Sequence, residues 1–296
     1  MTIVATQRTR PGKSSPPGTP LSRRRFLQAS ALAAGATVLA FPRWLRAGET
    51  ARRLNVGVIG LGGEGGVRLR ELLRCEVNIA AFCDVDASQT AKALQTLPSE
   101  APKPKTFIDY HELLAADVDA VVIATPDHWH APIARAALKA GKHVFCEKPL
   151  THTVAEAREL RLLAAQFPRL ATQMGNQGSA SPNMRRAIEL IQAGVIGQVR
   201  EVHVWVPPSK SFVAGQSRPT GQDPVPAGLD WNRWIGPAPF YEFVKRKYHP
   251  LAWRAWYDFG GGSIGDWGCH GLNLPFRALK LDYPTRITPE VPGGYT

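Results

Sequence analysis

The sequence predicts an α/β protein that begins with a doubly wound parallel sheet of the Rossmann type. Short apolar segments rich in Val, Ile and Ala alternate with segments of helical periodicity from residue 54 onward. The apolar segments are nearly continuous, as in strands that helices cover on both faces. Such alternation is typical of parallel sheets. A second, smaller α+β domain with a mostly antiparallel open sheet is expected to follow.

The predicted elements of the Rossmann domain follow each other in order along residues 51–175. Strands are expected at 54–59, 77–83, 120–124, 143–146 and 170–174. Helices are expected between them at 65–74, 88–97, 131–140 and 153–166.

The second domain is expected at residues 176–296. It opens with a predicted helix at 182–193 and a predicted strand at 199–206, in which polar and apolar residues alternate as on a one-faced sheet. The chain then ends in a turn-like segment at 291–296 with few strands behind it. We therefore expect the second sheet to be incomplete and the chain to be truncated.

The net charge of +12 is concentrated at the N-terminus. Residues 1–53 hold ten of the 36 basic residues and one of the 24 acidic ones, a charge of +9, which leaves +3 for the rest. The order of a polar run, the segment SRRRFL at 22–27 and an apolar stretch at 31–41 resembles a twin-arginine export signal. A basic surface for nucleic acid is therefore not predicted.

Residues 1–50 are accordingly interpreted as a signal and linker. The prediction is a bacterial protein exported to the periplasm by the twin-arginine translocase. Counted from Phe26, the apolar stretch covers about 16 residues, which is shorter than the roughly 20 needed to span a bilayer, so no permanent anchor is expected. The cleavage position stays open, because Ala40 and Ala47 both offer a small side chain. Cys75, Cys83, Cys146 and Cys269 show no disulfide pattern.

A glycine-rich turn follows the first predicted strand. Gly60, Gly62 and Gly65 fit the pattern G-x-G-x-x-G between a strand and a helix, where the backbone, including Leu61, can approach a pyrophosphate. Asp84 ends the next strand, close to the spacing of a carboxylate that binds a ribose diol. Because a carboxylate repels a 2'-phosphate, NAD is predicted rather than NADP. FAD shares the pattern and remains an alternative.

Two polar segments follow later strands, at the sheet edge where ligands of such folds bind. They are TPDHWH at 125–130 and CEKP at 146–149. A partly desolvated lysine such as Lys148 can polarise a substrate hydroxyl. His128 and His130 lack a third metal ligand, so no metal is predicted. The residues expected to contact the cofactor from these segments are Thr125, Pro126, His130, Glu147 and Lys148.

Together these segments resemble the Gfo/Idh/MocA oxidoreductases, the family of glucose-fructose oxidoreductase and inositol dehydrogenase. The resemblance covers Asn55 to about Pro284 and also rests on AGKHV at 140–144, WIGPAP at 234–239 and GDWGCH at 265–270. It implies an NAD-dependent enzyme acting on CH-OH groups. Hydride would pass between a secondary alcohol of a carbohydrate or polyol and the nicotinamide.

The resemblance also implies roles for particular residues. Lys148 would contact the reacting carbinol, and the Lys148-Pro149 peptide bond that follows can be cis. His270 would be the acid/base group, with Asp266 beside it. If this stretch is helical, Asp266 and His270 share one face, where a carboxylate can orient an imidazole. Pro275 should bend or end that helix. The residues expected to contact the substrate are Trp253, Arg254 and Asn273.

Other functions remain open at this point. A retained NAD that transiently oxidises a glycoside would give net glycosidic cleavage. A sugar- or nucleotide-binding protein without turnover is a third alternative. The segment GGSIG at 261–265 matches the nucleophile elbow of hydrolases, but that motif needs an acid and then a histidine well downstream, and only His270 follows, seven residues after Ser263. A serine hydrolase is therefore not predicted. Family members assemble through the second sheet, so a homo-oligomer is an open alternative.

Overall fold

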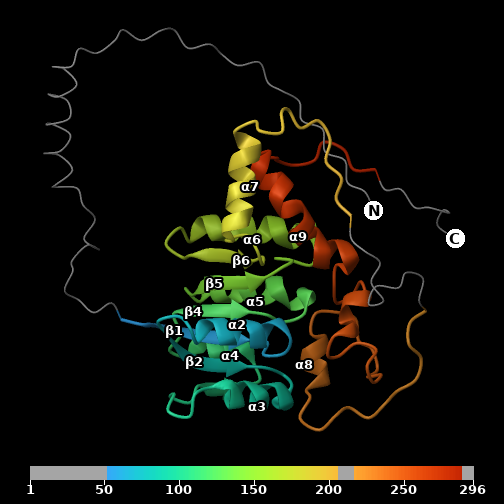
Figure 1. Ribbon diagram of the computed structural model, residues 1–296. Helices are drawn as coiled ribbons and strands as arrows, with labels where there is room; N and C mark the ends of the chain where they lie inside the picture. Colours follow the sequence, from blue (N-terminus) through green and yellow to red (C-terminus); the bar gives the residue numbers. More distant parts are fainter. Residues whose placement is uncertain (1–51, 206–216, 289–296) are drawn as a thin grey trace, which may run out of the picture. The chain divides into compact units, whose positions relative to one another are not determined.

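The computed structural model describes residues 52–205 and 217–288 (Figure 1). The predicted export signal at 1–50 lies outside these residues, as does the turn-like segment at 291–296. None of the helices in the described ranges is long and apolar enough to cross a membrane. All four cysteines are free thiols.

A six-stranded parallel sheet forms the first domain, in the order β3-β2-β1-β4-β5-β6. This is the doubly wound order, so the predicted fold class is confirmed. The order reverses between β1 and β4, and ligands of such sheets bind at that point, beyond the carboxyl ends of the strands. The strands are β1 (Leu54–Ile59), β2 (Val77–Cys83), β3 (Lys105–Phe107), β4 (Ala120–Ile123), β5 (His143–Glu147) and β6 (Thr172–Gly175).

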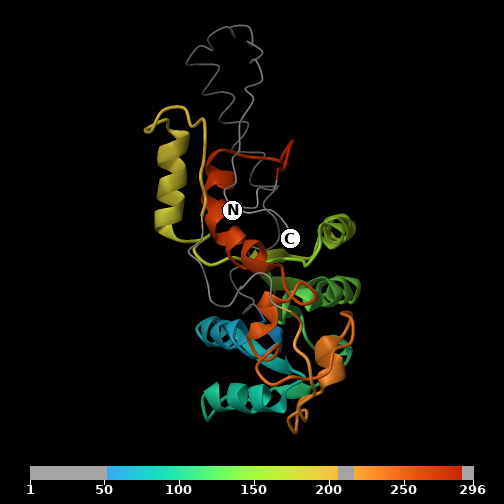
Figure 2. The same ribbon diagram turned by 90° about the vertical axis from the view of Figure 1, so that its right-hand side faces the viewer.

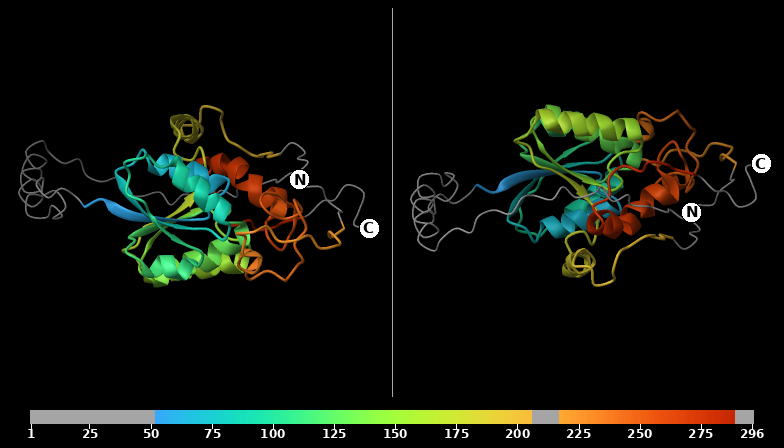
Figure 3. Two further views of the ribbon diagram at one scale, coloured as in Figure 1. Left: turned by 90° about the horizontal axis from the view of Figure 1, so that it is seen from below. Right: turned by 90° about the horizontal axis from the view of Figure 1, so that it is seen from above.

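Helices cover both faces of the sheet (Figures 2 and 3). Each layer encloses its own core, one around Leu69 and Phe82 and the other around Leu113 and Ile123. Two buried faces explain why the strands are nearly continuous in apolar residues. One face carries α2 (Glu64–Leu72) and α3 (Ala87–Thr96), and the other carries α4 (Tyr110–Ala115), α5 (Asp127–Lys139) and α6 (Val154–Gln166).

Helix α5 begins four residues earlier than predicted. The segment 127–130, expected in a loop, is its first turn. Pro126 immediately precedes this turn, a place where proline is well tolerated because the first N-H groups of a helix have no intrahelical partner. Asp127 and His130 of this turn line the cavity described below, which is why polar residues interrupt the apolar pattern.

The regular elements described after residue 175 are helices, joined by long irregular segments. They are α7 (Pro182–Gln192), α8 (Trp231–Ile235), the 3-10 helix η2 (Ala252–Ala255) and α9 (Gly262–Ala278). Helices α7 and α9 pack side by side (Figure 2). The helix predicted at 182–193 is thereby confirmed.

The strand predicted at 199–206 is not found in its described part, since residues 199–205 form no regular structure. A strand requires a neighbour that pairs with its N-H and C=O groups. Residues 176–205 and 217–288 contain no other strand that could pair with it. Alternation of polar and apolar residues is therefore not sufficient to form a strand in this segment.

An aromatic cluster packs against the carboxyl ends of the sheet. Trp231 and Trp234 stack with ring centroids 4.7 Å apart. Two backbone hydrogen bonds join the cluster's segment to the loop after β2, from Asp230 N to Val85 O (2.8 Å) and from Ala87 N to Gly228 O (2.9 Å). The cluster consists of Leu229, Trp231, Trp234, Ile235, Phe243, Tyr248, Trp253 and Phe259.

Candidate active site

The glycine turn between β1 and α2 is sterically specified. Gly60 has a φ of +83°, and a Cβ there would lie 2.7 Å from the carbonyl oxygen of Ala124. A Cβ on Gly65 would lie 2.0 Å from the oxygen of Gly60. Both positions therefore require glycine. The turn leads directly into the N-terminus of α2, whose free N-H groups suit a phosphate.

Asp84 stands at the carboxyl end of β2, beside the glycine turn. Its Oδ2 accepts the N-H of Leu61 (2.7 Å) and its Oδ1 accepts the N-H of Asp86 (2.9 Å). Burial raises the pKa of Asp84 to about 6, although these backbone hydrogen bonds oppose the rise. Each carboxylate oxygen keeps a lone pair for a further donor.

A cavity of about 510 Å³ opens at this edge of the sheet. It is lined by the glycine turn, Asp84, Lys148 and Asp266, among others. The buried hydroxyl of Thr125 has no hydrogen-bond partner among the described residues. A glycine cradle, a buried carboxyl group at the end of β2 and an unsatisfied hydroxyl in one cavity fit a dinucleotide.

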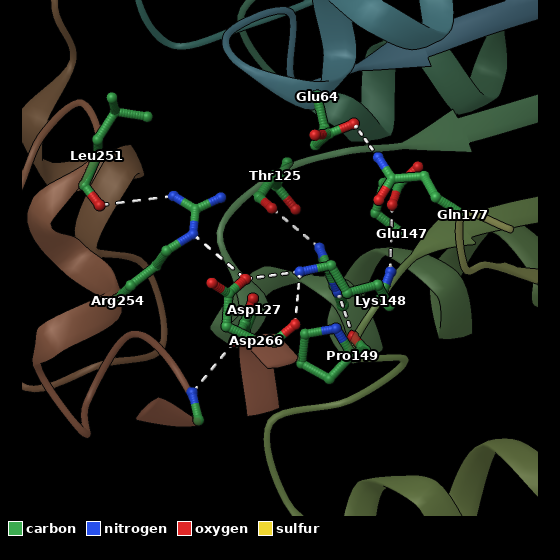
Figure 4. Close-up of polar contacts among 12 residues, drawn as sticks. Glu64, Thr125, Asp127, Glu147, Lys148, Pro149, Gln177, Leu251, Arg254 and Asp266 are labelled. Carbon is green, nitrogen blue, oxygen red and sulfur yellow. Dashed lines mark hydrogen bonds and ion pairs between the residues drawn. The ribbon is translucent and has the colours of Figure 1, made fainter. Parts of the chain in front are cut away.

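Lys148 and Asp266 meet in this cavity, as Figure 4 shows. Lys148 follows β5, and its Nζ donates to Asp266 Oδ1 (2.6 Å) and to the backbone oxygen of Asp266 (2.9 Å). The lysine side chain is 10% exposed and the aspartate 21%. The Lys148-Pro149 bond is cis, as the family resemblance implied. Two predicted catalytic residues are thus brought together from distant parts of the chain.

His270 lies one helical turn after Asp266 on α9 and is half-buried. Asp266 was expected to pair with His270. In the structure its carboxylate instead contacts Lys148 and lies 3.6 Å from Arg254 Nε. Two permanent cations attract the carboxylate more strongly than a neutral imidazole does. Burial, followed by the charge of Lys148, lowers the pKa of His270. His270 is not among the residues that line the cavity.

His130 and Glu147 line the cavity, but their polar atoms also hold the protein together. The ring nitrogens of His130 lie 2.7 Å from Pro149 O and 2.9 Å from Thr125 O, so this buried imidazole joins two loops. Glu147 Oε1 lies 3.0 Å from Arg68 Nε of α2, and burial raises the pKa of this carboxyl. Pro126 also lines the cavity.

The three predicted substrate-binding residues separate into two groups. Trp253 and Arg254 line the cavity, and the guanidinium lies 4.2 Å from the centroid of the indole. Asn273 instead donates to Ser179 Oγ (2.6 Å) and joins α9 to the loop before α7. Asn273 therefore lies outside the cavity lining, whereas it was expected to contact the substrate.

Asp127 is a cavity residue to which the sequence analysis gave no role. It is 5% exposed, and its Oδ2 accepts the N-H of Gly261 (3.1 Å) just before α9. Burial raises the pKa of this carboxyl. The sequence feature that could have indicated a role for Asp127 is its position between a strand and the helix that follows, where ligands of such sheets bind. Its neighbour His128 lies between the carbonyls of Trp234 and Phe259, and burial lowers the pKa of this imidazole to about 4.

A doubly wound sheet with a glycine cradle at its switch point, and a lysine-aspartate pair in the same cavity, is typical of dinucleotide-binding oxidoreductases. Sequence comparison specifies the family. Residues 54–172 match the Gfo/Idh/MocA oxidoreductase family, NAD-binding Rossmann fold, and residues 185–285 match the C-terminal alpha/beta domain of the same family. The chain belongs to the Gfo/Idh/MocA oxidoreductase family, and NAD is the cofactor of its Rossmann domain.

Among its curated relatives is an inositol 2-dehydrogenase of Salmonella typhimurium, 34% identical over 153 residues, which are 51% of this chain and 45% of that protein. Another is a glycosyl hydrolase family 109 protein of Saccharopolyspora erythraea, 32% identical over 216 residues, 67% of this chain and 46% of that one. The chain spans about half the length of these relatives. A solved scyllo-inositol dehydrogenase from Lactobacillus casei, with NAD(H) and scyllo-inositol bound, is 27% identical with a TM-score of 0.46, covering 50% of this chain and 43% of that one.

Proposed function

We propose that this protein is an NAD-dependent oxidoreductase that oxidises a secondary alcohol of a sugar or cyclitol-like substrate. The observation that carries the proposal is the ammonium of Lys148, held 2.6 Å from Asp266 in the same cavity as the glycine turn. The relatedness to an inositol 2-dehydrogenase supports this substrate class.

The residues at the switch point have the properties needed to hold NAD. The glycine turn and the N-terminus of α2 would bind the pyrophosphate, and Asp84 would accept hydrogen bonds from a ribose. Thr125 offers a free hydroxyl beside them. When bound, NAD supplies the acceptor for the hydride that leaves the carbinol carbon.

Lys148 would bind the substrate hydroxyl and stabilise the negative charge that develops on its oxygen. Asp266 fixes the position of the ammonium through two hydrogen bonds. His270, one helical turn after Asp266 on α9 but outside the cavity lining, is proposed to accept the hydroxyl proton. Its lowered pKa supports this role, since a neutral imidazole at pH 7 can act as a base.

The test is formation of NADH from a panel of cyclitols and aldoses by the purified protein. Lys148→Ala should lower kcat/KM at least about 100-fold, because it removes the charge that stabilises the oxyanion. His270→Ala should lower kcat about 100-fold or more. Lys139→Ala, at the exposed end of α5, is the matched control and should leave activity unchanged. Full activity in both site variants would refute the proposal.

A second candidate is cleavage of glycosides through transient oxidation by a retained NAD. The similarity to a glycosyl hydrolase family 109 protein favours it. Release of free aglycone from a panel of glycosides without net NADH would support cleavage. Stoichiometric NADH would support the dehydrogenase instead.

Export through the twin-arginine pathway to the periplasm is also proposed, on the basis of the SRRRFL segment at 22–27. Replacing the Arg23-Arg24 pair by Lys-Lys in the full chain should leave the protein in the cytoplasmic fraction. An unchanged periplasmic fraction would contradict this interpretation.

A further inference from the structure

Part of the Arg254 guanidinium has no close hydrogen-bond acceptor among the described residues. Its Nε lies 3.6 Å from Asp266 Oδ1, and its Nη1 donates to Leu251 O at 3.5 Å (Figure 4). Both distances exceed the roughly 2.7 to 3.2 Å of ordinary N-H···O hydrogen bonds. Over residues 52–205 and 217–288, the structure gives this guanidinium no further hydrogen bond or ion pair. Most of its five donors are therefore available.

The guanidinium is nevertheless held in place. It lies over the indole of Trp253, with 4.2 Å between the guanidinium carbon and the ring centroid, and Trp253 is only 6% exposed. Stacking on an immobile ring fixes the plane of the guanidinium, whose N-H groups form a planar fork, before a ligand binds. Less conformational entropy is therefore lost on binding. The Arg254 side chain is 27% exposed and lines the cavity.

This stacking changes what the cavity presents to a substrate. An open indole face would suit the apolar face of a neutral sugar, but the face of Trp253 is covered by a cation. Lys148 is already paired with Asp266 at 2.6 Å, and Asp266 has only a longer contact left for Arg254. Of these two cations, Lys148 has a carboxylate at hydrogen-bonding distance and the guanidinium of Arg254 does not.

We propose that Arg254 binds a carboxylate of the substrate, so that the substrate class is a sugar acid or other carboxylate-bearing polyol. A planar fork pairs with a planar carboxylate through two parallel hydrogen bonds. A single arginine matches one negative charge, which favours a carboxylate over a phosphate dianion. The inference rests on the proposed function, since it names the substrate of the same site.

The experiment compares matched substrates on the full-length, NAD-loaded protein. D-Glucuronate and D-galacturonate are measured against D-glucose and D-galactose, and against glucose 6-phosphate. NADH formation gives kcat and KM, and titration calorimetry gives binding without turnover. The variants are Arg254→Gln, which removes the charge, and Arg254→Lys, which keeps the charge but loses the fork. Arg135→Gln, whose arginine pairs with Glu159 on the exposed side of α5, is the control.

The uronates should bind at least about tenfold more tightly than the neutral sugars. Arg254→Gln should raise KM and the dissociation constant for uronates about 10- to 100-fold and change those for neutral sugars less than about threefold, with Arg254→Lys intermediate. Arg135→Gln should behave as wild type. Thermal unfolding of each variant separates loss of the fork from loss of the fold.

Three outcomes would overturn the assignment. They are an equal loss for uronates and neutral sugars in Arg254→Gln, preferred binding of glucose 6-phosphate, and absence of uronate binding by calorimetry. Uronate binding that depends on Arg254 but yields no NADH would support the carboxylate site and contradict the proposed dehydrogenase. Failure of one proposal is thereby distinguished from failure of the other.

Discussion

The carboxyl group of Asp84 changes its charge close to neutral pH. Burial raises its pKa to about 6, so the unliganded protein loses this negative charge as the pH falls through 6. A ribose diol donates two hydrogen bonds, and an ionised carboxylate accepts both better than a protonated one. The affinity for NAD should therefore depend on pH.

NAD should bind about tenfold more weakly at about pH 5 than at about pH 8, because only about a tenth of the Asp84 side chains are ionised at the lower pH. The sign follows from the raised pKa, since the binding-competent carboxylate predominates above pH 6. Titration calorimetry measures the dissociation constant. Asp84→Asn keeps an acceptor but cannot ionise, so its affinity should be nearly constant across this range. The same pH dependence in that variant would assign the effect to another group.

The sequence predicted Lys148, Asp266 and Arg254 as site residues, but it did not predict which of them pair. Lys148 and Asp266 are 118 positions apart, and their contact depends on how α9 docks on the sheet. Helical spacing indicated His270 as the partner of Asp266, because spacing describes one helix only. The ion pair of Glu147 with Arg68 was missed for the same reason, since it joins β5 to α2.

The turn from β1 into α2 illustrates how tightly one element fixes its neighbour. The missing side chain of Gly65 allows α2 to approach the Gly60 carbonyl, and Gly65 N donates to Gly62 O (2.8 Å). The adjacent Gly66 is different, because a Cβ there would come no closer than 3.5 Å to Leu61 O. Of these two neighbouring positions, only that of Gly65 therefore requires glycine for steric reasons.

Gly65→Ala should destabilise the protein by about 1 to 3 kcal/mol, since the added methyl group displaces α2 from the turn. It should also weaken NAD binding at least about tenfold, because the N-H groups that face the pyrophosphate move with the helix. Urea unfolding and calorimetry measure the two effects. Gly66→Ala is the matched control and should be neutral or stabilising by up to about 1 kcal/mol. Equal effects of both substitutions would show that packing against Gly60 is unimportant.

The elements that sequence alone predicted well are those buried on two faces, where the apolar pattern is strong. Their bounds agree with the structure within a few residues. β3 was missed, because this edge strand has only three residues and two of them, Lys105 and Thr106, are exposed. Edge strands need no continuous apolar pattern. The strand expected at 199–206 shows the opposite error, in which a suitable pattern lacks a pairing partner in the described part of the chain.

In the molecule as a whole, the aromatic cluster connects the second region to the Rossmann sheet. Trp234 packs in the cluster, lines the cavity and accepts the Nε1-H of Trp129 at its backbone oxygen (3.0 Å). Stability and cofactor binding should therefore depend on the same side chain.

Trp234→Ala should lower the free energy of unfolding by about 3 to 5 kcal/mol, as expected when a buried aromatic ring is removed. NAD should also bind more weakly, so that saturating NAD raises the melting temperature less than it does in wild type. Thermal unfolding with and without NAD measures both effects. Trp205→Ala, at a position 76% exposed, is the matched control. A stable variant with wild-type NAD affinity would show that the cluster does not support the cavity.

The cavity draws its lining from residues as far apart as Ile59 and Asp266. During synthesis the sheet emerges from the ribosome before α9 does. A nascent chain that ends after β6 would already carry the glycine turn and Lys148, yet it would lack the carboxylate that pairs with this lysine. Tight capture of NAD is therefore expected late in translation, after the residues of α9 have left the ribosome.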